Sequence, residues 1–111
     1  MEMTMETQTG EGVVSIILDG QITFENIGPI KACLAEALDD WRVELIEFDL
    51  RRVEFIDSAG LAAVVSPRRF RFAPRPVRIL VEPGSQPDRV IRLARFNLVA
   101  EVVTDADREE S

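Results

Sequence analysis

The chain of 111 residues contains no histidine, no tyrosine and a single cysteine, Cys33. The absence of histidine excludes Ser-His-Asp and Cys-His catalysis and histidine-ligated metal sites, and one cysteine excludes an internal disulfide. Cys33 lies within a helical pattern, where an inert thiol is far more common than a reactive one. We therefore expect a protein that is not an enzyme, with no catalytic residue, no cofactor and no metal site.

Basic residues are in the minority, with 13 Lys and Arg against 20 Asp and Glu and a formal net charge of −7. Such a chain repels phosphate backbones and anionic membranes, so no nucleic acid partner is expected. The acidity is concentrated at the two ends of the sequence. We divide the chain into an acidic segment at 1–12 with an expected edge strand, a nearly neutral folded body at 13–104 and an acidic tail at 105–111.

Long hydrophobic runs are also missing. No stretch reaches the roughly 18 consecutive apolar residues that a transmembrane helix needs. The first 12 residues lack the basic-then-apolar layout of a secretory signal. We therefore expect no direct membrane insertion and a reducing, cytoplasmic location.

Hydrophobic periodicity predicts strands that alternate with helices. Short apolar or alternating runs predict strands at 4–9, 13–18, 43–50, 77–81 and 101–103. The first two are expected to form a hairpin, and Asp19-Gly20 is expected to turn the chain after the second. Because the later connections are long enough for crossovers, most neighbouring strands should be parallel.

Three helices are expected between these strands. The first has Asn26 as its cap and Pro29 in its first turn. The second begins at Ser58 as the capping residue and ends or kinks at Pro67, and the third follows a capping box at Ser85. The apolar stripe of the first helix consists of Ile27, Ile30, Leu34, Leu38 and Trp41. The apolar positions of the third are Val90, Ile91, Leu93, Ala94 and Leu98.

Ser58 stands at the point where a strand stops and a helix begins. Ala59 and Gly60 follow it and keep the surface small and open. A helix N-terminus presents unpaired N–H groups and a partial positive charge, which favours negative charge on Ser58. Phosphorylation there would add about −1.5 to −2 charges at one point of the surface.

The segment 55–61 (FIDSAGL), with 18–22 (LDGQI) and the order of strands and helices, resembles the STAS domain family of anti-sigma-factor antagonists and their relatives. The similarity runs over about 13–103. It implies an α/β fold: a single small domain with a mixed, mostly parallel, curved sheet, an N-terminal hairpin and helices packed on one side.

The resemblance also implies a function and a site. It identifies Ser58 as a phosphoacceptor in a partner-switching pathway. The implied partners are an anti-sigma factor that doubles as a serine kinase, and a phosphatase; the unmodified form binds the kinase and frees the sigma factor. The partner-binding surface implied by this resemblance comprises Thr23, Asp57, Ser58, Ala59, Gly60 and Leu61.

Two departures from the family pattern bear on this expectation. Thr23 stands where many members have a carboxylate near the phosphorylation site, which weakens a direct carry-over of kinase recognition. Thr23 either caps or turns the chain or offers a second modifiable hydroxyl. The sequence 66–69 (SPRR) replaces a continuous second helix, so docking along that helix is expected to differ.

Several alternatives remain open at this point. In the first alternative, the chain is a non-switching STAS accessory module of a sulfate or anion transporter or of a lipid-transport complex. A nucleotide-binding role would rest on the arginine run from Arg68 to Arg78, which is more often a solvated face. In a third alternative, Asp57 is a phosphoacceptor of the receiver-domain type. The sequence offers neither the acidic pair after the first strand nor the well-placed lysine that Mg²⁺ binding at such a site would need. It also stays open whether Ser58 is only a helix cap and whether the chain forms a dimer.

Overall fold

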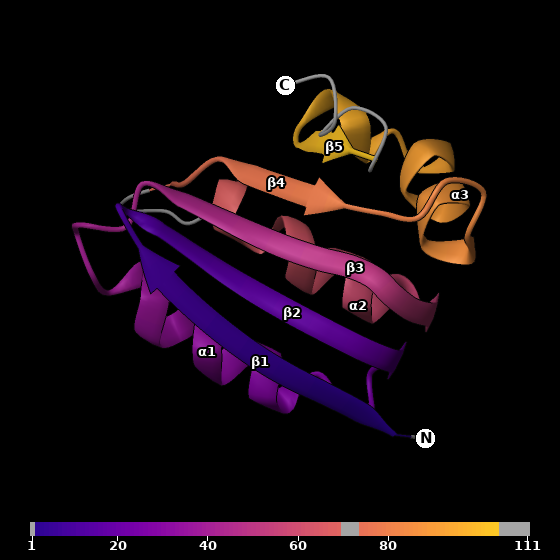
Figure 1. Cartoon of the computed structure of the whole chain (residues 1–111), viewed down its shortest axis with the longest axis horizontal. Helices are drawn as coiled ribbons and strands as arrows, with labels where there is room; N and C mark the ends of the chain where they lie inside the picture. The colour runs from indigo at the N-terminus through magenta and orange to yellow at the C-terminus, as the bar shows by residue number, and fades with distance from the viewer. Residues whose placement is uncertain (1, 70–73, 105–111) are drawn as a thin grey trace.

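The computed structural model describes residues 2–69 and 74–104. These residues form one five-stranded sheet with three α-helices (Figure 1). The strands are β1 (Met3–Gly10), β2 (Val13–Ile22), β3 (Leu45–Ile56), β4 (Val77–Leu80) and β5 (Glu101–Val103). The helices are α1 (Gly28–Leu38), α2 (Ser58–Val65) and α3 (Gln86–Leu93), with short 3-10 helices at Ser66–Arg69 and Phe96–Leu98.

The strands lie side by side in the order in which they occur along the chain. The hairpin of β1 and β2 is antiparallel, and each later strand is parallel to the one before it. Each parallel crossover moves one place in the same direction, so crossovers of the usual right hand place their helices on the same face. Figure 1 shows α1 and α2 behind the sheet and α3 beside the end of β3. The predicted fold class is confirmed.

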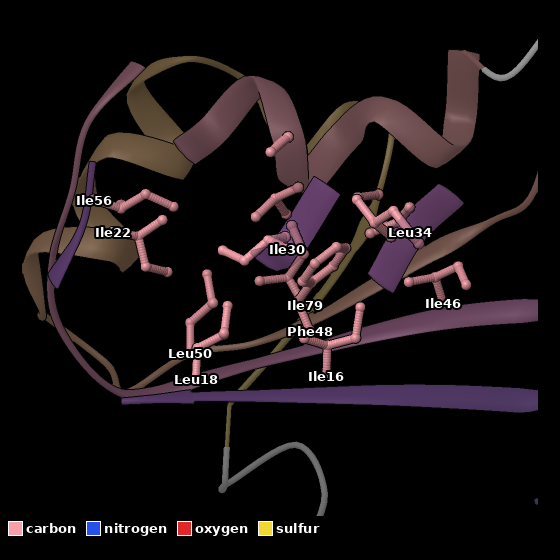
Figure 2. Close-up of a cluster of buried hydrophobic side chains, with 14 of the residues drawn as sticks. Ile16, Leu18, Ile22, Ile30, Leu34, Ile46, Phe48, Leu50, Ile56 and Ile79 are labelled. Atoms are coloured by element: carbon pink, nitrogen blue, oxygen red, sulfur yellow. The ribbon is translucent and has the colours of Figure 1, made fainter. Parts of the chain in front are cut away.

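Alternating strand residues fill the core between the sheet and its helices (Figure 2). The inward side chains come mainly from β2, β3 and β4, and α1 adds its apolar stripe from the other side. The central members, each at most 3% exposed, are Ile16, Leu18, Ile30, Leu34, Ile46, Phe48, Leu50 and Ile79. Burial of this continuous apolar layer is the main force that holds the helices to the sheet.

The predicted turn at Asp19-Gly20 is wrong, because β2 continues through it to Ile22. The pairing of β2 with β3 shifts register here, which is the signature of a bulge. Gly20 has a φ of +100°, and a Cβ at this position would clash with the carbonyl oxygen of Glu2. Glycine therefore allows the strand to bend and go on to the edge of the sheet where Ser58 lies.

Two expectations for α1 are corrected. Its cap residue is Ile27, without a side-chain hydrogen bond, and Asn26 bonds within the preceding loop instead. Trp41 is 86% exposed because α1 ends at Leu38, so Trp41 lies beyond the helical stripe. Pro29 occupies the first turn as predicted.

The ends of α2 and α3 are set by specific residues. The α-helix α2 stops at Val65 and tightens into a 3-10 turn containing Pro67, as predicted. Ser85 caps α3 as expected, with its side chain accepting from the Asp88 N–H. The predicted continuation to Leu98 is wrong, because Arg95 adopts a left-handed conformation, and Leu98 is exposed.

The face of the sheet opposite the helices carries polar side chains that bond across the strands. Ser15 of β2 donates to Glu47 of β3 at 3.2 Å. Arg78 of β4 pairs with Glu47 at 3.2 Å and with Glu101 of β5 at 3.3 Å. These bonds pair the polar side chains on a face of the sheet that none of α1, α2 and α3 covers. Among the described residues, no helix is both long and apolar enough to cross a bilayer.

Candidate functional site

The candidate site lies where β2 and β3 end, at the carboxyl edge of the parallel strands. Here the chain leaves β2 into the loop 23–27 and leaves β3 through Asp57 into α2. The backbone N–H of Asp57 donates to the carbonyl of Ile22 at 3.0 Å, which ties the two exits together. This edge of an α/β sheet is where binding sites are usually built.

Asp57, and not Ser58, caps α2. The Asp57 backbone is extended, and its Oδ1 accepts from the Gly60 N–H at 2.9 Å. The expectation that Ser58 is the capping residue is therefore wrong. Aspartate and serine are about equally good caps, so the sequence does not distinguish between these two adjacent residues, and the local backbone geometry decides which one caps the helix.

Ser58 is the first residue of the helix, and its side chain is exposed. It forms no side-chain hydrogen bond with any other residue that the structure describes. Because Asp57 performs the capping, the Ser58 hydroxyl is not needed to start the helix. A free hydroxyl therefore stands at the positive end of α2, in contact with solvent.

The residues after Ser58 bring α2 close to the sheet. Gly60 is buried, and a Cβ there would lie 2.6 Å from Cγ1 of Ile56 and 2.9 Å from Cγ2 of Ile22. Only glycine allows this approach without displacement of the core. Ala59 and Leu61 are half-buried and contribute partly apolar surface beside Ser58.

The second oxygen of Asp57 reaches the loop after β2. Its Oδ2 accepts from the Phe24 N–H at 3.0 Å, so one carboxylate holds two segments 33 residues apart. The Phe24 side chain is 70% exposed. No sequence motif marked Phe24; the available signal was a bulky aromatic next to Thr23, outside any helical stripe.

Thr23 lies beneath this surface. It is 6% exposed, and its hydroxyl accepts from the Glu25 N–H at 3.3 Å. We assign Thr23 to the structure of the loop, which agrees with the first of its two expected roles. Its predicted contact with a partner stays a prediction, and Phe24 is the residue that the loop exposes.

A third segment joins this edge through Gln86, the first residue of α3. Its side-chain amide accepts from the Ile56 N–H at 2.9 Å and donates to the Ile56 carbonyl at 3.0 Å. Nearby, the Asp88 carboxylate accepts from the Gly84 N–H at 2.9 Å and from Arg92 at 2.7 Å. Burial opposes ionisation of Asp88, but these donors outweigh it and hold the pKa of Asp88 below its usual value.

Comparison with known families decides what kind of domain this is. The model of the STAS domain matches residues 4–106. The chain belongs to the STAS domain family. A search of curated proteins finds no relative of significant similarity.

The fold of this STAS domain is shared with solved anti-sigma factor antagonists. The antagonist from Mycobacterium paratuberculosis superposes with a TM-score of 0.79 at 18% identity, covering 91% of this chain and 85% of that one. The antagonist SpoIIAA in its unphosphorylated form gives 0.74 at 19% identity, covering 96% and 94%. The Bacillus cell fate determinant SpoIIAA in the phosphorylated form gives 0.69 at 20% identity, covering 96% and 97%. At these identities the likeness establishes the fold.

The two arginines of the run at positions 75 and 78, both described by the structure, do not lie in one patch in the STAS domain. Arg75 is buried and donates to the backbone carbonyls of Leu38, Asp40 and Val43. Arg78 lies in the network on the open sheet face, and Arg71 is outside the described residues. The described arginines therefore give the nucleotide hypothesis no convergent site.

A hollow of about 540 Å³ lies between the hairpin turn and α1, at the other end of the STAS domain. Thr7, Thr9, Cys33 and Glu36 are among its lining residues. Burial, with a contribution from Glu36, raises the pKa of the Cys33 thiol, which lowers its reactivity. Among the described residues, no three side chains of the metal-binding types cluster together.

Proposed function

We propose that this STAS domain is an anti-sigma-factor antagonist, a protein-binding module that reversible phosphorylation of Ser58 switches off. The observation that carries the proposal is the exposed Ser58 hydroxyl, unbonded within the described residues and placed at the first position of α2. The proposed partners are an anti-sigma factor with serine kinase activity and a phosphatase. The fold shared with solved antagonists supports this assignment.

The unmodified surface suits protein docking. Ala59 and Leu61 are half-buried beside Ser58, and the glycine at position 60 keeps the helix start low against the sheet. A partner that packs here excludes water from the Ser58 hydroxyl, which is neutral and inexpensive to desolvate compared with a charged group.

A phosphate on Ser58 changes this balance locally. Its two negative charges would be buried in the interface without a partner built to receive them, which strongly opposes binding. The loops at this edge, 23–27, Asp57 and 81–85, contain Glu25, Asp57 and Glu82 and no basic residue. These loops supply no cation of their own to neutralise the group, and the guanidinium of Arg89, which reaches loop 81–85 from α3, is bonded to the Gly84 carbonyl. Binding is therefore lost with little refolding.

The direct test uses the purified anti-sigma-factor kinase of the same organism with ATP. Mass spectrometry should find one added phosphate on Ser58, and none on the Ser58→Ala variant. In a binding assay with the same kinase, Ser58→Ala should bind like the unmodified chain, and Ser58→Asp should bind at least tenfold more weakly. Phosphate on another residue, or equal binding of both variants, contradicts the proposal and favours a non-switching STAS module.

A further inference from the structure

We infer that Phe24 is the aromatic anchor of the docking surface and that Asp57 positions it beside Ser58. The inference rests on the proposed function and names a residue outside the α2 segment. The occupant is the protein that binds the unmodified form, and it must offer an apolar pocket that accepts a phenyl ring. Phe24 makes the contact, whereas Asp57 acts through Phe24.

Exposure alone does not single out Phe24. Among the residues that the structure describes, the other large hydrophobic side chains that are well exposed are Trp41, Phe55, Leu93, Leu98 and Val99. Phe24 differs because its backbone N–H is bound by the residue immediately before Ser58, with the Asp57 Oδ2 at 3.0 Å. Its side chain, 70% exposed, therefore projects from a loop whose backbone is bonded to the residue before Ser58.

The loop that carries Phe24 is held by its own polar side chains. Thr23 donates its N–H to Asn26 Oδ1 at 2.9 Å, and the Asn26 amide donates to the Gln21 carbonyl at 2.7 Å. Glu25 donates its N–H to the Thr23 hydroxyl at 3.3 Å. A loop restrained in this way loses little freedom on binding, which is the property of an effective anchor.

This arrangement also explains why one phosphate suffices as a switch. The Asp57 carboxylate bonds both Gly60 at the start of α2 and Phe24 in the loop, so Ser58 directly follows the residue that joins the two segments. A partner that inserts an aromatic anchor must close over this position. A dianion on Ser58 would then be trapped beside an apolar pocket, where its desolvation is least compensated.

The experiment measures the affinity of the purified anti-sigma-factor kinase for five forms of the unmodified chain by calorimetry. The forms are the unaltered chain, Phe24→Ala, Asp57→Asn, the double variant and Trp41→Ala. Trp41 is the matched control, an aromatic that is 86% exposed and precedes the amino end of β3. Circular dichroism melts establish that each form is folded.

We expect Phe24→Ala to weaken binding by about tenfold to thirtyfold and Trp41→Ala to change it by less than about twofold. Asp57→Asn retains one carbonyl oxygen for two N–H donors, so it should weaken binding by about threefold to tenfold. If Asp57 acts through Phe24, the double variant binds no more weakly than Phe24→Ala. If Asp57 has a purely structural role, the loss of affinity in Asp57→Asn adds in full to that of Phe24→Ala in the double variant. That result would refute the positioning role.

The outcomes separate this inference from the proposed function. If the unaltered chain binds the kinase and Phe24→Ala binds equally well, the anchor is refuted while the switch stands. If Trp41→Ala weakens binding as much as Phe24→Ala, the site assignment is refuted. If the unaltered chain binds no kinase, the proposed function fails and the inference fails with it.

Discussion

Two exposed aromatic residues lie at opposite ends of this domain, and their surroundings differ. Phe24, at the carboxyl edge of the sheet, has its backbone N–H bonded by Asp57, the residue before the exposed Ser58. Trp41, in the loop before β3, lies between Asp40 and Arg42, whose side chains bond to each other at 3.0 Å. The comparison teaches that exposure does not identify a docking site. What distinguishes the Phe24 end is an exposed apolar side chain on a loop bonded to the residue before Ser58, the proposed phosphorylation site.

The largest expected effect concerns the loop that carries Trp41. Arg75 is buried and bonds the carbonyls of Leu38, Asp40 and Val43. Arg75→Met keeps much of the volume but leaves these acceptors without their donor, and should lower the free energy of unfolding by about 3 kcal/mol. Urea denaturation measures this change. The exposed Arg68→Met is the control, expected within about 0.5 kcal/mol, and equal losses would show that Arg75 is not a structural clamp.

The next effect tests the close approach of α2 at the Phe24 end. In Gly60→Ala, the new methyl would meet Ile56 at 2.6 Å and Ile22 at 2.9 Å. Overpacking of this kind should cost about 2 kcal/mol. Gly28→Ala is the matched control because no atom lies within 4 Å of its added Cβ, and its stability should be equal or slightly higher. Two equal melting temperatures would contradict the packing described for α2.

A smaller effect distinguishes the capping role of Asp57 from the proposed switching role of Ser58. Asp57→Ala loses both the α2 cap and the bond to Phe24, so it should lower the unfolding free energy by about 1.5 kcal/mol. Ser58→Ala should change it by less than about 0.5 kcal/mol. Thermal melts of the two variants compare these values. A larger loss in Ser58→Ala would mean that the hydroxyl supports the fold and is not reserved for modification.

The smallest effect depends on pH and involves Asp88. Its pKa is lowered in the folded chain against the opposing effect of burial, by the Gly84 N–H and Arg92. A lowered pKa stabilises the fold above the ordinary aspartate pKa of about 4, and this stabilisation is lost as pH falls through the folded-state value. Asp88→Asn should therefore be about 1 kcal/mol less stable at pH 7, with the gap closing in acid. A gap that stays constant from pH 7 to pH 3 would refute this origin.

Much of the fold follows from local patterns, and much of the site does not. The strand alternation around Phe48 and the helical spacing of Ile30 and Leu34 each reflect burial on one face, which the sequence encodes directly. The placement of Ser58 just after a strand also follows from the local sequence pattern. In contrast, the bond between Asp57 and Phe24 joins residues 33 apart and exists because two parallel strands end at the same edge.

The open face of the sheet has a practical consequence for observing the molecule at work. Gln8 lies on β1 opposite Ser15, whose side chain belongs to that polar face. A fluorophore attached through Gln8→Cys would therefore report from the side away from α2. Because burial raises the pKa of Cys33, the introduced surface thiol should react first near neutral pH. Tethering through the same position would immobilise the domain with its Ser58 edge still free to meet other molecules.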